Sequence, residues 1–190
     1  GVSVSVAPRE GDERYNFEND DLGFVDTESG ALLKIGMSSE DVEKLIGAPR
    51  TVDRDGFRIY SGIVIKYDDN GNASQMIVAA GNMEGDDNPN RFVSPRGVKL
   101  STTLDEFKSV YGDEYNEPSQ AAEGDESIKS SAMMAVRYYA KNGDTFNYLG
   151  GSYTKENKPE NDADLIMQTF LFSTETKTVS VMSVGNGTAN

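Results

Sequence analysis

The sequence predicts an α+β fold of two layers, in which two tandem repeats each pack a short capped helix on an antiparallel β-sheet. The first observation is an internal repeat, because the stretch 32–49 recurs without a gap at 97–112, with Val42 matching Phe107. The second is that apolar residues alternate with polar ones after each copy, as in strands that bury one face. One helix on one face of such a sheet gives two layers and leaves the other face open.

Each copy begins with the signature of a capped helix. Ser38 stands three residues before Asp41, and Thr103 stands three residues before Glu106. This is capping-box spacing, in which the hydroxyl accepts a bond from a free backbone N–H and the carboxylate reaches back to the cap. We therefore expect the two helices to begin immediately after Ser38 and Thr103.

Both helices are expected to be short and to bury one apolar stripe. Gly47 and Gly112 end them, since glycine tolerates the left-handed conformation that follows a helix, and Pro49 prevents continuation of the first. Helices of this length are marginal in isolation, so each stripe has to pack against the sheet. The stripes are Val42, Leu45 and Ile46 in the first helix, and Leu104, Phe107, Val110 and Tyr111 in the second.

Antiparallel strands are predicted after the first helix. Alternation covers residues 57–60 and 63–67, and a return strand covers 75–80. The segment 68–72 between them, Asp-Asp-Asn-Gly-Asn, is typical of a hairpin turn built on Asn-Gly. A calcium loop fits less well, because its glycine position would place Lys66 at the first ligand position.

The second half follows the same plan with insertions. Strands are expected at 133–140, 145–149, 165–172 and 177–184, separated by an acidic loop at 113–130 and a polar loop at 150–164. In each half we expect a meander, in which strands adjacent in the sequence pair with one another. The organisation is then an acidic tether without fixed structure at 1–22, a first repeat at 23–86 and a second repeat with long insertions at 87–186.

The charge of the chain excludes one class of partner. The net charge is −14, and segments 1–30 and 113–126 each contribute −6 to it, so that the remaining body is nearly neutral. Nucleic-acid binding depends on clustered Lys and Arg beside the phosphates, and this distribution disfavours it. The sequence also has no apolar run long enough to cross a membrane.

The composition argues against the common enzyme chemistries. Cysteine and histidine are both absent, which removes thiol nucleophiles, disulfides, histidine bases and the usual zinc sites. The acid pairs fall in predicted turns, where a carboxylate is simply solvated, whereas a catalytic pair needs contrasting environments. We predict no catalytic residues, no metal site and no cofactor. The acid pairs are Asp53 with Asp55, Asp86 with Asp87, and Asp162 with Asp164.

The first copy of the repeat, from Ile35-Gly36-Met37-Ser38 to Gly47-Ala48-Pro49, resembles a motif of two extracytoplasmic families. One is the SmpA/OmlA group of outer-membrane assembly lipoproteins, which carry one such unit. The other is the beta-lactamase-inhibitor-protein family, which carries two in tandem and places its partner on the exposed sheet face. The tandem arrangement favours the second family. The resemblance implies secretion and a binding role, whereas the missing cysteines separate this chain from the inhibitors.

A candidate binding surface follows from strand parity. If Phe57, Ile59, Ile63 and Ile65 face the helix, then alternate residues face away from it. Arginine and tyrosine side chains often anchor protein interfaces. The alternative is an ordinary solvated strand face. The residues expected to face outward are Arg58, Tyr60 and Lys66 in the first half, with Arg137 and Tyr139 in the second.

These observations predict a non-enzymatic, extracytoplasmic protein-binding module that uses the open sheet face, and an inhibitor is one form that such a module takes. Because the sequence begins at Gly1, we expect a targeting segment to be missing, with the chain secreted or membrane-anchored through it. The partner would be a protein of the envelope or extracellular space. One alternative is an envelope assembly or scaffold lipoprotein. Another is a hydrolase, which would require a deep pocket lined by at least two buried acids.

Overall fold

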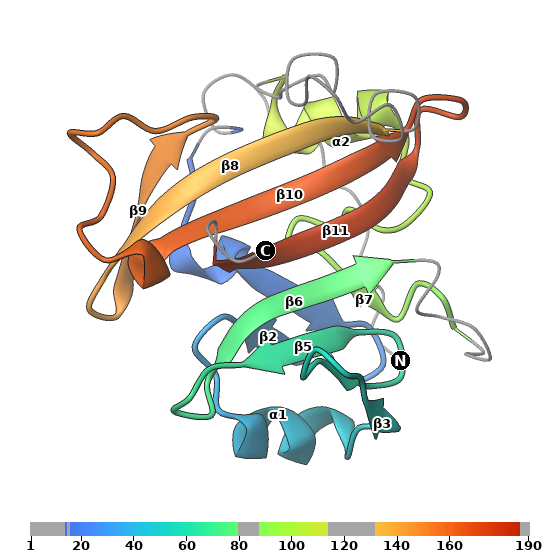
Figure 1. Cartoon of the computed structure of the whole chain (residues 1–190). Helices are drawn as coiled ribbons and strands as arrows, with labels where there is room; N and C mark the ends of the chain where they lie inside the picture. Colours follow the sequence, from blue (N-terminus) through green and yellow to red (C-terminus); the bar gives the residue numbers. More distant parts are fainter. Residues whose placement is uncertain (1–13, 15, 80–87, 114–131, 187–190) are drawn as a thin grey trace.

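The computed structural model describes Arg14 and residues 16–79, 88–113 and 132–186. These residues form an α+β structure with two sheets (Figure 1). The larger sheet has eight antiparallel strands, in the order β3 (Thr51–Val52), β4 (Arg58–Ile59), β5 (Val64–Tyr67), β6 (Ala73–Ala79), β11 (Val179–Asn186), β10 (Leu165–Ser173), β8 (Ala132–Asn142) and β9 (Thr145–Gly150). The smaller has three, in the order β2 (Leu32–Lys34), β1 (Gly23–Asp26) and β7 (Phe92–Val93).

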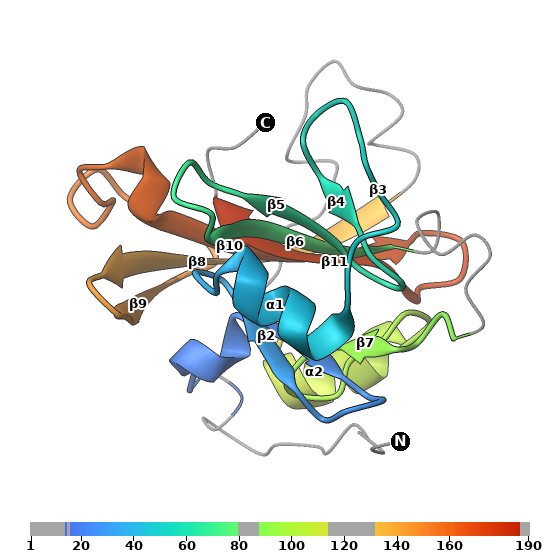
Figure 2. The ribbon, with the colours of Figure 1, turned by 90° about the horizontal axis from the view of Figure 1, so that it is seen from below.

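The remaining elements pack on one side of the larger sheet. Helices α1 (Ser39–Ile46) and α2 (Leu104–Tyr111) and the three-stranded sheet all lie below it in Figure 2. Two short 3-10 turns, η2 (Asn19–Asp21) and η5 (Asp162–Asp164), precede β1 and β10. The predicted two-layer α+β class is therefore confirmed.

The helix boundaries follow the predicted caps. The Ser38 hydroxyl accepts a hydrogen bond from the Asp41 N–H at 3.1 Å, and the Thr103 hydroxyl accepts one from the Glu106 N–H at 3.2 Å. Each helix ends at its glycine, with φ of 86° at Gly47 and 83° at Gly112, a region that side chains disfavour.

The two helices differ in how deeply they are buried. Phe107, Val110 and Tyr111 of α2 are all fully buried. In α1 only Val42 is buried, whereas Leu45 is 44 % exposed, so the prediction that Leu45 belongs to the buried stripe is wrong. The physical reason is position: α1 lies at one end of the molecule beside β5, and the core reaches a narrower strip of its surface (Figure 1).

The pairing of the strands confirms one predicted meander and corrects the other. In the first half β3, β4, β5 and β6 pair in sequence order, and the turn at 68–72 closes with an Asp68 N–H bond to the Asn72 carbonyl. In the second half β8 lies between β9 and β10, so a simple meander is wrong there. The long polar connection after β9 lets the chain return on the other side of β8.

The two predicted repeat segments share one core. Strand β6 pairs with β11, which makes the larger sheet continuous across both halves. Buried residues from the first half, such as Leu33 and Met76, belong to the same apolar cluster as Phe107 and Phe170 from the second. The boundary region 80–87 lies outside the described residues.

The N-terminal prediction is corrected for residues 16–22. Phe17 packs against the core, and Asp21 and Leu22 are buried, so this part of the expected tether has a fixed structure. Residues 1–13 and nearly all of the acidic loop, 114–131, lie outside the described residues. Neither helix in the described part of the chain has the length and apolar character needed to cross a membrane.

Candidate functional site

Two of the residues predicted to face outward in the first half face α1 instead. The Arg58 guanidinium donates to the Glu43 carboxylate of α1 at 3.0 Å and lies 4.8 Å from the centre of the Tyr67 ring. Tyr60 is 1 % exposed, and its hydroxyl bonds both Glu43 and Tyr67. The prediction that Arg58 and Tyr60 belong to the open face is wrong.

A tight turn explains this change of face. The Tyr60 N–H donates to the Ile63 carbonyl across the two residues Ser61 and Gly62. Directly paired residues of antiparallel strands lie on the same face, so Tyr60 joins buried Ile63, and Arg58 joins buried Ile65. The dipeptide Ser61-Gly62 is typical of a turn, and it is the local sequence feature from which this turn could be predicted.

The two predicted residues of the second half are also on the helix side. Arg137 is fully buried, and its guanidinium donates to the Tyr111 carbonyl of α2. Tyr139 is 1 % exposed and packs against Tyr148, and burial raises the pKa of its hydroxyl well above the usual value. Met134, Val136 and Tyr138 alternate with these two residues along β8 and lie on the opposite face.

Lys66 keeps its predicted orientation. It alternates with buried Ile65, and its ammonium lies 5.4 Å from the centre of the Phe57 ring. Of the five residues predicted for the binding surface, Lys66 alone lies on the face that the helices leave uncovered.

That face has a regular composition that can be read from the strand registers. One row crosses the sheet through Val64, Ile77, Ser183, Thr169 and Val136. A second runs through Lys66, Gln75, Gly185, Met167 and Tyr138, and a third through Ala79, Val181, Leu171 and Met134. We call these three rows the sheet face.

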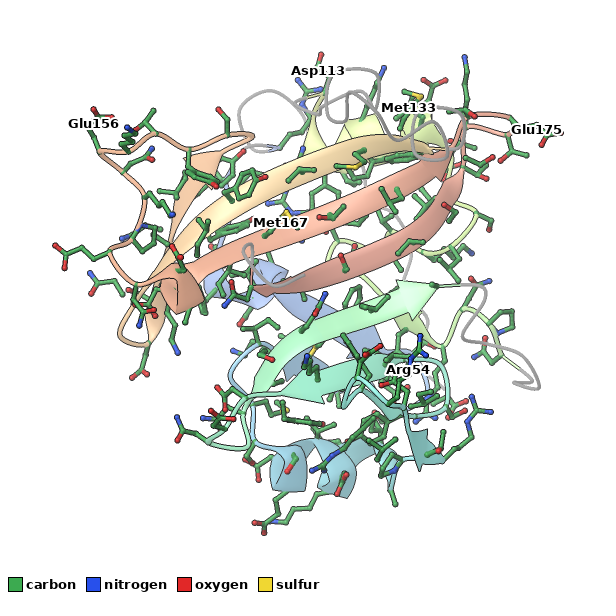
Figure 3. All side chains as sticks on the ribbon, in the orientation of Figure 1. Arg54, Asp113, Met133, Glu156, Met167 and Glu175 are labelled. Carbon is green, nitrogen blue, oxygen red and sulfur yellow. The ribbon has the colours of Figure 1, made fainter. Side chains whose placement is uncertain are left out.

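The sheet face is apolar and nearly uncharged. Lys66 is the single charged residue in its three rows, in a chain of which 26 % is charged. Met167, near the middle of β10, lies on the side of the sheet that faces the viewer in Figure 3. Met167, Leu171, Ile77 and Val181 are partly exposed and available for contact, whereas Val64, Thr169 and Val136 of the first row are buried. Glu156 and Glu175 lie at opposite tips of the structure (Figure 3).

A cavity opens at one end of the sheet, beside the start of α1. Its volume is about 510 Å³, which is in the range of small-molecule sites. Its acids, Asp41 and Asp144, are exposed. The buried acids of the described chain, Asp21 and Asp26, are each paired with an arginine. The cavity is also lined by Lys34, Met37, Lys141 and Phe146.

The predicted acid pairs that lie within the described residues have structural roles. The Asp53 carboxylate accepts bonds from the backbone N–H groups of Asp55 and Phe57, and thereby closes a turn. Asp162 pairs with Lys158 on an exposed turn. Asp86 and Asp87 lie outside the described residues. Within the described ranges, no three acidic side chains are grouped as metal ligands.

Comparison with known proteins gives no relative for this chain. No family model, no curated protein and no solved structure matches it.

Proposed function

We propose that this protein is a non-enzymatic binding module whose sheet face docks a partner protein. The observation that carries the proposal is the contrast between this face and the rest of the chain. The three rows of the sheet hold one charged residue, whereas 26 % of the residues in the chain are charged. The solvent-facing side of an antiparallel sheet normally carries polar residues. A large apolar patch with a polar rim is instead typical of an interaction site.

The character of the face indicates the chemistry of the partner. Methionine, leucine and tyrosine side chains such as Met167, Leu171 and Tyr138 supply adaptable apolar contacts, and the interiors of interfaces are depleted in charge. We therefore infer a protein partner with an apolar contact surface.

The resemblance of the motif at 32–49 supports an extracytoplasmic setting for this activity. We propose that the chain is built from tandem repeats as in the inhibitor-like family, and is secreted or membrane-anchored. The two helix caps support the repeat, because they make equivalent contacts with the sheet. Ser38 forms an isolated β-bridge with Asn72, and Thr103 forms one with Thr178, in each case at the end of a hairpin turn. An envelope assembly scaffold is the second candidate, and the SmpA/OmlA resemblance supports it.

The proposal is tested by affinity capture from envelope extract and culture fluid. Met167→Lys and Leu171→Lys place a charge in the middle of the sheet face at partly exposed positions. We expect each substitution to reduce partner capture by at least about tenfold, because a buried unpaired charge at an interface costs several kcal/mol.

Leu45→Lys is the matched control. It makes the same type of change at a residue of α1 that is 44 % exposed, and should leave capture unchanged. Thermal unfolding of the three variants establishes that each is folded. Equal capture by all three variants and the wild type would contradict the proposal.

A further inference from the structure

We propose that the cavity beside the start of α1 binds a small zwitterion with an apolar body, namely a free amino acid or a dipeptide with aliphatic side chains. One wall of the cavity is the loop before α1, with Ile35 and Met37. The other is the hairpin of β8 and β9, with Lys141, Asp144 and Phe146. None of the residues in the three rows of the sheet face lines this cavity, so the inference is independent of the proposed protein partner.

The lining carries two unpaired charges of opposite sign. Of its two lysines, Lys34 is already in an ion pair at 2.9 Å, and of its two acids, Asp41 lies 3.9 Å from a lysine of its own helix. Within the described ranges, no carboxylate pairs with the Lys141 ammonium and no cation pairs with the Asp144 carboxylate. A ligand with one carboxylate and one ammonium group matches these two free charges.

Apolar side chains line the cavity beside the charged groups. Ile35, Met37 and Phe146 are partly buried and pack against the core, so they present an apolar surface of fixed position. Small-molecule sites typically combine an apolar lining with a few polar groups that fix the orientation of the ligand. An aliphatic side chain would cover this surface, and for this reason we infer an apolar body between the two charged ends of the ligand.

The wall formed by the loop before α1 is held by backbone hydrogen bonds to β6. The Gly36 N–H donates to the Ala73 carbonyl, and the Ala73 N–H donates to the Met37 carbonyl, both at 2.8 Å. These bonds fix the loop whether or not a ligand is bound. A preformed wall reduces the cost of ordering the site on binding.

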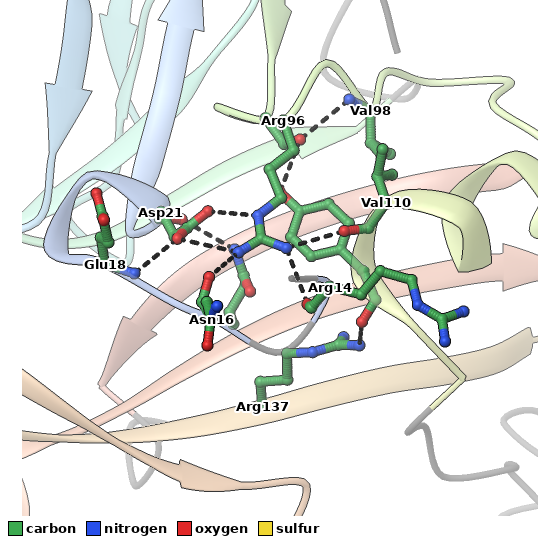
Figure 4. A network of polar contacts seen from close by, with 11 residues as sticks. Arg14, Asn16, Glu18, Asp21, Arg96, Val98, Val110 and Arg137 are labelled. Carbon is green, nitrogen blue, oxygen red and sulfur yellow. Dashed lines mark hydrogen bonds and ion pairs between the residues drawn. The ribbon is translucent and has the colours of Figure 1, made fainter. Parts of the chain in front are cut away.

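The wall formed by the β8–β9 hairpin is held through η2. Asn19 Oδ1 accepts a hydrogen bond from the Phe146 N–H at 3.0 Å, and Asn19 Nδ2 donates to the Asp144 carbonyl at 3.4 Å. The last residue of η2, Asp21, accepts a bond from Arg96 Nε at 2.8 Å (Figure 4). The hairpin is therefore tied to the body of the protein, and both walls of the cavity are preformed.

The volume suits a ligand of this size. The cavity measures about 510 Å³, and a second cavity of about 140 Å³ is lined in part by the same residues, Ile35, Gly36, Asn72 and Lys141. The first volume lies in the range of small-molecule sites. The second cavity adds space beside Lys141, so that a dipeptide has room as well as a single amino acid.

Isothermal titration calorimetry of the full chain with L-leucine and with L-leucyl-L-leucine tests the proposal. We expect saturable binding of at least one of these probes, and the one that binds distinguishes an amino acid from a dipeptide as the ligand. Two blocked forms of that probe are the chemical controls: N-acetylation removes its ammonium group, and C-amidation removes its carboxylate. Each blocked form should bind at least about tenfold more weakly, because one of the two charged contacts is lost.

Lys141→Met and Asp144→Asn each remove one free charge at an exposed position, and each should weaken binding of the unblocked probe by at least about tenfold. Lys99→Met is the matched control, since Lys99 is an exposed lysine that corresponds to Lys34 in the repeat and lines neither cavity. Thermal unfolding establishes that each variant is folded. The proposal would be overturned if neither probe bound the folded wild type saturably, or if the Lys141 and Asp144 substitutions left binding unchanged.

Discussion

Arg96 and Asp21 form a buried ion pair between residues that are 75 positions apart in the sequence. The pair joins the segment before β1 to the turn before α2, and the side chains are only 1 % and 9 % exposed. It therefore ties the beginning of the described chain to the second half of the molecule. A buried charge that loses its partner is strongly destabilising, so the pair sets a testable expectation.

Replacing Arg96 by Ala should lower the free energy of unfolding by about 3–5 kcal/mol, because it leaves the Asp21 carboxylate buried and unpaired. Urea unfolding measures the change. Lys34→Ala is the control: Lys34 Nζ and Asp20 Oδ1 are similarly close, at 2.9 Å against 2.8 Å for Arg96 and Asp21, but the Lys34 and Asp20 side chains are 42 % and 67 % exposed. An exposed pair contributes at most about 1 kcal/mol, so similar losses in both variants would contradict this account.

Asp26 should make stability dependent on pH. Burial alone would raise the pKa of Asp26, but bonds from Arg91, the Glu28 N–H and Ser29, with the Arg91 charge, hold that pKa below its usual value. A lowered pKa stabilises the folded state above the unfolded pKa, and this contribution is lost as pH falls through the folded pKa.

The measurement is urea unfolding of the wild type and Asp26→Asn at several pH values. The variant should be less stable at neutral pH, and the difference should shrink at pH values below about 4, where the unfolded carboxyl binds its proton. Asp55→Asn, at an exposed turn residue, is the control and should show no such trend. A difference that stayed constant from neutral to acid pH would count against the Arg91 pair as its origin.

The unequal burial of the two helices predicts unequal effects of truncation. Phe107 of α2 is fully buried against Phe170, Phe172 and Tyr111, with ring centres about 5 Å apart. Phe107→Ala should lower the free energy of unfolding by about 3–5 kcal/mol through the cavity it leaves. Leu45→Ala should lower it by less than about 1 kcal/mol, because that side chain already contacts water. Calorimetry of thermal unfolding measures both variants. Equal losses of stability would contradict the unequal burial of the two helices.

The helix caps predict a smaller, matched pair of effects. Ser38→Ala and Thr103→Ala each remove the oxygen that accepts the third N–H of its helix, and each should reduce stability by about 1 kcal/mol. Ser109→Ala is the control within α2, since its hydroxyl bonds the Glu106 carbonyl inside the helix and alanine favours helix. The midpoints of denaturant unfolding measure the three variants. If the two cap substitutions reduced stability no more than Ser109→Ala does, the capping role of Ser38 and Thr103 would be refuted.

The local features of the fold were predictable because each depends on neighbouring residues. The caps at Ser38 and Thr103, the glycine stops and the turn at 68–72 all lie within a few residues of their partners. The order of β8, β9 and β10 depends on which side of β8 the chain returns to, and no local signal in the loop after β9 decides that.

The candidate surface was harder to predict because alternation identifies two faces without saying which one is buried. Arginine and tyrosine were expected to face solvent, yet Arg137 and Tyr139 face the core. Inside, the Arg137 guanidinium bonds the Tyr111 carbonyl and lies 5.5 Å from the centres of the Phe107 and Tyr111 rings, which compensates for its burial. These contacts come from α2 and cannot be inferred from the strand alone.

Site-specific photo-cross-linking in envelope extract tests whether the sheet face is the binding surface. A photoreactive amino acid is placed at Met167, in the middle of the sheet face, or at Leu45, on the exposed side of α1. We expect a discrete protein adduct from position 167 and none from position 45. Adducts from position 45 alone, or no adduct from position 167 in a folded protein, would contradict the assignment of the sheet face as the binding surface.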